Sequence, residues 1–284
     1  MSGRELVRLP WRLWARQLGA VLRLELKRTL FSRRAWWIYL LAAAPVLLCG
    51  AHAVVLLWMQ KRAWHSVAED SVAFAAIYHI FYLRLGIFFG CVGIFMHLFR
   101  GEVLEKTLHY YLLAPIRREL LVLGKYLAGL VAGVTYFGLS TAASCLLLPS
   151  HFGPAYRDFL FQGPGLDHLG WYVAVTTLAV IGYGGVFLLM GLLFRNPIIP
   201  AGLVMIWETN NWLLPSAAQK VSVVFYLTNL CPVPAPPKGA LAILAVTPDP
   251  VPAWMAIPGL LLVTAALIAL AALKARRLEI SYAE

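Results

Sequence analysis

The chain has 284 residues, of which 61% are hydrophobic and 13% are charged, and its formal net charge is +11. Soluble globular domains carry about 45–50% apolar and about 25% charged residues, so this composition excludes an ordinary soluble domain. The basic residues flank apolar runs instead of covering a polar domain, which favours a membrane over nucleic acid as the partner.

Residues 1–35 are basic and contain no long apolar run. Within 11–34, cations recur at about helical spacing on one face, at Arg12, Arg16, Arg23 and Lys27. The opposite face is apolar and contains Trp11, Trp14, Leu18, Val21 and Leu22. This pattern predicts a cytoplasmic amphipathic helix in the headgroup plane of the lipid. A soluble helix packed on a partner is the alternative.

Six apolar runs are candidates for crossing a bilayer, which takes roughly 20 mostly apolar residues. They are residues 36–59, 78–99, 120–148, 170–194, 198–214 and 253–273. The fifth run is the shortest and the most polar. Backbone in lipid must satisfy its own hydrogen bonds, so these runs are predicted to be helices. We expect an all-α fold in which residues 36–284 form one six-span transmembrane domain.

Lysines and arginines are concentrated in residues 1–35, between the second and third predicted spans, and after the last span. Positive loops of membrane proteins face the cytoplasm. We therefore expect a multi-pass protein of the inner (plasma) membrane with both termini in the cytoplasm, which agrees with an even number of spans.

Segment 101–114 lies between the second and third predicted spans and is predicted to be a short amphipathic helix. One face carries polar side chains at i, i+3, i+4 and i+7, namely Glu102, Glu105, Lys106 and His109. Pro115 ends the helix because proline cannot continue one. A short charged helix between two spans suits docking of a cytoplasmic partner. A surface helix that only closes the loop fits the same pattern.

Segment 215–252 is apolar but is interrupted by prolines, among them Pro215, Pro232 and Pro248. The pieces 216–230 and 239–247 are too short to cross a bilayer. Apolar stretches of this length are typical of re-entrant or interfacial structure. Two re-entrant half-helices are therefore predicted before the last span.

Two ionisable residues fall inside predicted spans, Arg84 in the second and Glu208 in the fifth. An isolated charge in a membrane costs at least about 2.5–3.5 kcal/mol. One hypothesis is that the two pair, or that both face a polar pathway together with Asn210 and Asn211. The alternative is that Arg84 extends to the headgroups while Glu208 is protonated or lies near them.

The order of these elements resembles the permease subunit of ATP-binding-cassette (ABC) exporters of the type-2 family, over essentially the whole chain. The family has a glutamate before Gly-Thr-Leu, then Leu-Leu-x-x-Pro, a basic residue and Gly-Lys. The matching residues are Glu102, Thr107, Leu108, Leu112, Leu113, Pro115, Arg118, Gly124 and Lys125, with one residue between Leu113 and Pro115 where the family has two. Lys106 stands where the family has glycine.

The resemblance implies that segment 101–114 is a coupling helix seated on a separate cytoplasmic ABC ATPase. The implied docking residues are Glu102, Glu105, Lys106, Thr107, His109, Pro115 and Arg118. It also implies a second permease copy, most simply as a homodimer, surrounded by membrane lipid. ATP and Mg²⁺ would be bound by the ATPase subunit.

The chain contains no G-x-x-x-x-G-K-[ST] phosphate-binding loop, so we expect it to be no enzyme by itself and to bind no cofactor. His151, Asp158, Asp167 and His168 share the outer link between the third and fourth spans, but their spacing matches no ligand pattern. No metal site is predicted from them.

Three other classes compete with the exporter. An ion-coupled secondary transporter favours an inverted repeat, and no convincing repeat relates 36–148 to 170–273. A membrane-embedded enzyme requires clustered histidine or carboxylate groups at one membrane face, and the sequence displays none. A non-transporting scaffold subunit is the third. Drugs, lipids, peptides, glycans and ions all fit as the exported substrate.

Overall fold

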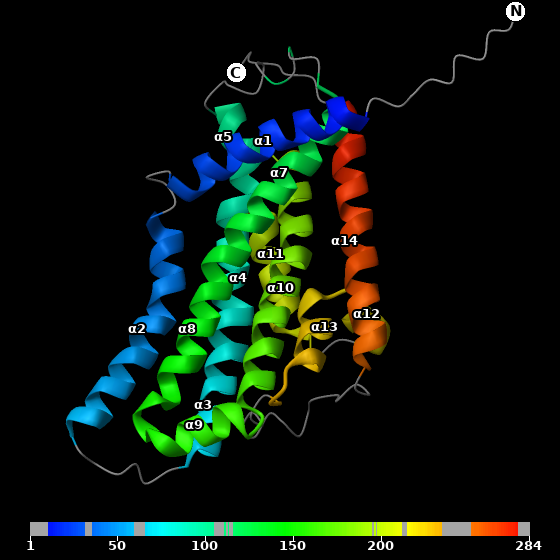
Figure 1. Cartoon of the computed structure of the whole chain (residues 1–284). Coiled ribbons are helices and arrows are strands. Elements are labelled where there is room, and N and C mark those ends of the chain that lie inside the picture. Colours follow the sequence, from blue (N-terminus) through cyan, green and yellow to red (C-terminus); the bar gives the residue numbers. More distant parts are fainter. Residues whose placement is uncertain are drawn as a thin grey trace, which may run out of the picture.

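The computed structural model describes residues 11–31, 36–59, 66–104, 111, 113, 116–194, 196, 198–211, 215–234 and 251–277. Every regular element within these ranges is a helix, which confirms the all-α prediction. The long helices run side by side as an elongated bundle, and α1 (Trp11–Phe31) crosses one end of it (Figure 1). The short helix α9 (Pro154–Phe161) lies at the opposite end.

Five helical segments of the described residues are long and apolar enough to cross a membrane. They are α2 (Trp36–Trp58), Val67–Val103, Arg118–Phe152, α10 (Gly165–Leu193) and α14 (Ala253–Arg276). The second segment consists of α3 (Val67–Ile77), η2 (Tyr78–Gly86), α4 (Ile87–Cys91), η3 (Val92–Met96) and α5 (His97–Leu104). The third consists of α7 (Arg118–Gly133), η4 (Val134–Gly138), α8 (Leu139–Leu147) and η5 (Leu148–Phe152). Five of the six predicted spans are thus long apolar helices.

The remaining predicted span, 198–214, is shorter than expected. Helix α11 (Ile198–Thr209) has 12 residues, which cover about 18 Å of a hydrocarbon core of about 30 Å. Asn210 follows directly, and its Nδ2 donates to the carbonyl of Ile206 at 2.8 Å. Asparagine competes with helical hydrogen bonding in this way, which explains the early end of the helix.

The predicted re-entrant region is described only in part. The piece 216–230 contains two short helices, α12 (Ser216–Gln219) and α13 (Val223–Leu230). The piece 239–247 lies outside the described residues. Helix α13 packs against α10 and α14.

Glycines set the distance between the central helices. A Cβ on Gly129 of α7 would lie 2.6 Å from the Phe95 ring, and one on Gly184 of α10 would lie 2.5 Å from the same ring. Phe95 of η3 is fully buried between the two glycines. Small residues allow close helix approach in membrane proteins, and here they make room for an aromatic side chain.

Helices α2 and α14 form the periphery of the bundle. Only 22% of the most apolar 18-residue stretch of each helix is buried inside the protein, whereas 56% of the corresponding stretch of α10 is buried. Their exposed faces carry large apolar side chains, including Leu47 and Trp58 on α2 and Trp254 and Leu262 on α14. Such faces suit contact with lipid or with another membrane helix.

Candidate functional site

Helix α1 packs along α7, and glycine makes this contact possible. A Cβ on Gly124 would lie 2.8 Å from Val21 Cγ1, so a larger residue at 124 would push the two helices apart. The side chains of Arg12, Arg16, Arg23 and Lys27 are exposed on the other face of α1. The two-faced helix predicted from the sequence is therefore present, and its apolar face covers α7.

An ion cluster, defined as Glu25, Glu102 and Lys125, lies beneath α1. Lys125 Nζ donates to Glu25 Oε1 and to Glu102 Oε1, each at 2.6 Å, and to the Leu98 carbonyl at 2.9 Å. The three side chains are at most 2% exposed. An ammonium group has three donors, and all three are used here. The cluster joins α1, α5 and α7 at one end of the bundle.

Further groups surround the cluster. Arg28 Nη1 lies 3.2 Å from Glu102 Oε1, and the Arg28 side chain is 33% exposed. The Tyr111 hydroxyl donates to Glu25 Oε1 at 2.9 Å, and the Tyr111 ring centroid lies 4.8 Å from Lys125 Nζ. Two acidic and two basic side chains are thereby brought together, and Lys125 is shared by both acidic ones.

The cluster also affects the ionisation of Glu25. Burial acts to raise its pKa, but the attraction of Lys125 and the hydrogen bonds donated by Lys125 and Tyr111 hold the pKa below its ordinary value. Glu25 is therefore ionised near neutral pH. Removing one partner of such a buried pair leaves an uncompensated charge and costs about 3–5 kcal/mol.

The predicted docking residues are placed differently from one another. Glu102 is buried, so its carboxylate contacts the chain's own lysine. Arg118 Nη1 donates to the carbonyls of Ala275 at 3.2 Å and Arg276 at 2.7 Å, at the C-terminal end of α14. A cation there is favourable because the last helical carbonyls lack partners. The other predicted docking residues, Glu105, Lys106, Thr107, His109 and Pro115, lie outside the described residues.

Sequence reasoning did not identify Glu25, and it identified Lys125 as a motif residue and a cytoplasmic cation without assigning it a partner. The sequence pattern around each of the two residues marks it as unusual. Glu25 follows Val21 and Leu18 at i+4 and i+7, so an acidic residue lies on the apolar face of the amphipathic helix. Lys125 lies inside the predicted third span, where a charge needs a partner. The sequence does not indicate that these two residues meet.

Glu208 caps helix α13. Its carboxylate accepts hydrogen bonds from the backbone N–H groups of Val223 at 3.0 Å and Val224 at 2.8 Å. It also accepts from the hydroxyls of Ser222 at 2.8 Å and Tyr183 at 3.2 Å. The first N–H groups of a helix have no partner within the helix, and a carboxylate satisfies them favourably.

The other residues of the predicted polar pathway are not gathered around Glu208. Arg84 is half-buried and lies close enough to interact electrostatically with Glu208, but no ion pair within 4.0 Å joins these two described residues. Asn210 is exposed. Asn211 is buried, and its Nδ2 donates to the Gln219 carbonyl at 3.4 Å.

The class of protein follows from the fold. No protein-family model matches the chain, and no curated protein is similar to it. The described residues are all-helical and include five helices long and apolar enough to cross a membrane. The chain is a multi-pass membrane protein.

Proposed function

We propose that the chain is the membrane-spanning subunit of an ABC exporter of the type-2 family, which moves a substrate outward across the inner membrane. In this proposal a separate cytoplasmic subunit binds ATP and Mg²⁺ and hydrolyses the ATP. One observation carries most weight. Three residues of the motif behind the resemblance, Glu102, Gly124 and Lys125, all lie at the contact between α1, α5 and α7.

The cluster gives a physical reason for that motif. Gly124 lets α1 approach α7, and Lys125 then reaches carboxylates on α1 and α5. Segment 105–115 follows directly on α5, so a force applied to that segment reaches three helices joined by short charged contacts. Such an arrangement suits transmission of movement from a docked ATPase into the spans.

The proposed partners fit the surfaces of the described chain. The exposed apolar faces of α2 and α14 suit lipid or a second permease copy. The exposed cations of α1 suit anionic headgroups on the cytoplasmic side. The proposal therefore places the α1 end of the bundle in the cytoplasm and the α9 end outside.

Because Glu102 is buried, docking and internal packing are tested with different variants. Glu105→Lys reverses a charge in the predicted docking segment, and Asp158→Lys is the matched control on an exposed residue of α9. The tagged chain is purified from native membranes, and the amount of co-purified ATPase with a phosphate-binding loop is measured.

We expect Glu105→Lys to reduce the co-purified ATPase at least about tenfold, which corresponds to about 1.4 kcal/mol of binding. Asp158→Lys should leave the amount unchanged. Purification of the wild-type chain without any such ATPase, with transport driven by an ion gradient instead, would favour the ion-coupled transporter.

A further inference from the structure

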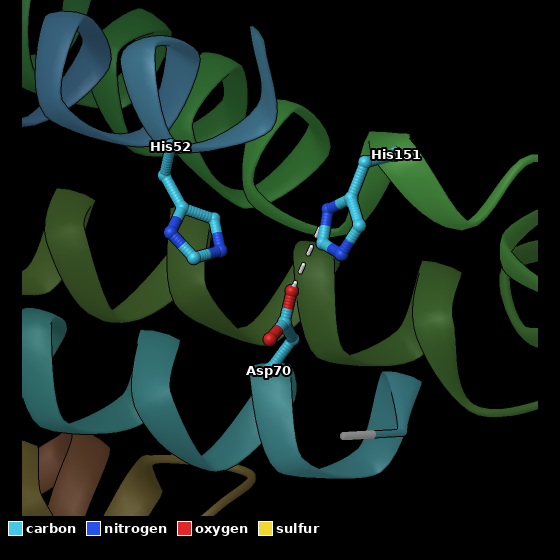
Figure 2. Close-up of side chains that lie close together, drawn as sticks. All are labelled: His52, Asp70 and His151. Atoms are coloured by element: carbon cyan, nitrogen blue, oxygen red, sulfur yellow. Dashed lines mark ion pairs between the residues drawn. The ribbon is translucent and has the colours of Figure 1, made fainter. Parts of the chain in front are cut away.

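Three side chains with metal-binding chemistry meet near the end of the bundle opposite α1. His52 comes from α2, Asp70 from α3 and His151 from η5, and the three point toward one another (Figure 2). One ligand atom of each residue lies within 4.8 Å of those of the other two. Residues that are far apart in the sequence are therefore gathered at one place.

The spacing of these groups is close to that of a metal site. His151 Nδ1 lies 3.9 Å from Asp70 Oδ2, and both side chains are at most 5% exposed. The rings of His52 and His151 lie with their centroids 5.6 Å apart. Ligands of a tetrahedral zinc ion, at about 2.0–2.2 Å from the metal, are roughly 3.3 Å from one another. Side-chain rotations that move the ligand atoms by about 1–1.5 Å therefore bring all three within bonding distance of one ion.

The donor set selects the class of ion. Imidazole nitrogens favour zinc and its neighbours among the transition metals, whereas Ca²⁺ and Mg²⁺ prefer oxygen ligands. Two histidines and one carboxylate form a known three-ligand zinc set that leaves one coordination position for water.

A small cavity beside Asp70 is an independent observation. Asp70, Tyr156, His168 and Tyr172 contribute to its lining. The hydroxyls of Tyr156 and Tyr172 are buried and have no hydrogen-bond partner among the described residues. Buried hydroxyl groups are commonly satisfied by ordered water. The cavity thus suits the water that completes the coordination of an ion.

We propose that His52, Asp70 and His151 bind one divalent transition-metal ion of the zinc class, with a water molecule from the adjacent cavity as the fourth ligand. The ion joins α2, α3 and η5, and so connects the first three long apolar segments at this end of the bundle. This proposal is independent of the exporter, because it concerns only side chains of this chain.

Zinc binding to the purified full chain tests the proposal. The chain is treated with a chelator in detergent, the chelator is removed, and Zn²⁺ binding is measured by competition with a fluorescent zinc indicator and by metal analysis. We expect one zinc ion per chain. Asp70→Asn should weaken zinc binding at least about tenfold, because even loss of a residue that only orients a ligand has an effect of 10–100-fold. Asp158→Asn, on an exposed carboxylate at the same end, should bind as the wild type does.

A second measurement reports the coordination geometry of the bound metal and so separates loss of the site from poor folding of a variant. Co²⁺ replaces zinc and gives visible absorption bands whose intensity reports tetrahedral coordination. The bands should be present in the wild type and in Asp158→Asn and lost in His52→Gln, which changes a half-buried side chain. Absence of zinc from the wild type, or equal zinc binding by Asp70→Asn and Asp158→Asn, would overturn the proposal. If Asp70 and His151 form only an internal ion pair, Asp70→Asn will lower the melting temperature equally with and without zinc.

Discussion

The two ends of the bundle hold their polar side chains in different ways. At the α1 end, Lys125 Nζ already bridges the side chains of Glu25 and Glu102 at 2.6 Å each. At the α9 end, the ligand atoms of His52, Asp70 and His151 are spaced by up to 4.8 Å. The chain's own lysine joins the acidic groups at the α1 end, whereas at the α9 end we propose that a bound cation joins the two histidines and the carboxylate.

The largest effect should come from removing the lysine. Lys125→Met leaves the carboxylates of Glu25 and Glu102 buried without their common partner, which should destabilise the chain by about 3–5 kcal/mol. Thermal unfolding in detergent measures the change. Lys27→Met, on the exposed face of the same contact region, should change stability by no more than about 0.5 kcal/mol. Equal melting of the two variants would show that the cluster contributes no stability.

A somewhat smaller effect is expected from crowding the contact between α1 and α7. Gly124→Ala places a Cβ 2.8 Å from Val21 Cγ1 and should cost about 1–3 kcal/mol. Val21→Ala removes that nearest atom. Gly124→Ala should therefore destabilise a chain that already carries Val21→Ala less than it destabilises the wild type. Gly19→Ala on α1 is the control, because its Cβ meets nothing within 4 Å. Additive effects of Gly124→Ala and Val21→Ala would contradict the contact.

The capping role of Glu208 predicts a local effect. Glu208→Ala leaves the buried N–H groups of Val223 and Val224 without their acceptor, at a cost of about 1–3 kcal/mol. Hydrogen exchange at these two amides should become faster. Asn210→Ala, on an exposed side chain, should leave the exchange unchanged. Unchanged protection in Glu208→Ala would mean that another group satisfies the start of α13.

Much of the fold was predictable, because apolar length and charge bias are local in sequence. Five long apolar helices and the two-faced helix α1 follow from such patterns. The end of α11 was misjudged because the apolar run was extended through Asn210 and Asn211, whereas the helix ends at Thr209. Helix length depends on side-chain competition for backbone groups as well as on hydrophobicity.

The sites were less predictable, because they depend on contacts between distant segments. Glu102 and Lys125 belong to a recognisable motif, but Glu25, which shares Lys125 with Glu102, lies on another helix. Only its position on an apolar face marks it in the sequence. The acceptor role of Glu208 depends on where α13 begins. The metal site was missed because the sequence suggested grouping His151 with nearby loop residues, whereas the fold brings it to His52 and Asp70.

The smallest effect concerns pH and the hydroxyl group of Tyr111. The pKa of Glu25 is lowered in the folded chain, so its stabilising contribution is present above the unfolded pKa of about 4.3 and is lost as the pH falls through the folded pKa. Tyr111→Phe removes one hydrogen bond to Glu25 and should cost about 0.5–1.5 kcal/mol near neutral pH. The difference from the wild type should shrink in acid. A difference that is constant with pH would show that the hydroxyl does not act through the ionised Glu25.

The exporter proposal requires that segment 105–115 face the cytoplasm, where an ATPase can reach it. His109→Cys, in a chain whose four native cysteines are replaced, can be labelled with a maleimide that does not cross membranes. We predict that position 109 is labelled only after the cells are permeabilised. Labelling in intact cells would place this segment outside the cell and would contradict the orientation, the docking of an ATPase and the exporter function together.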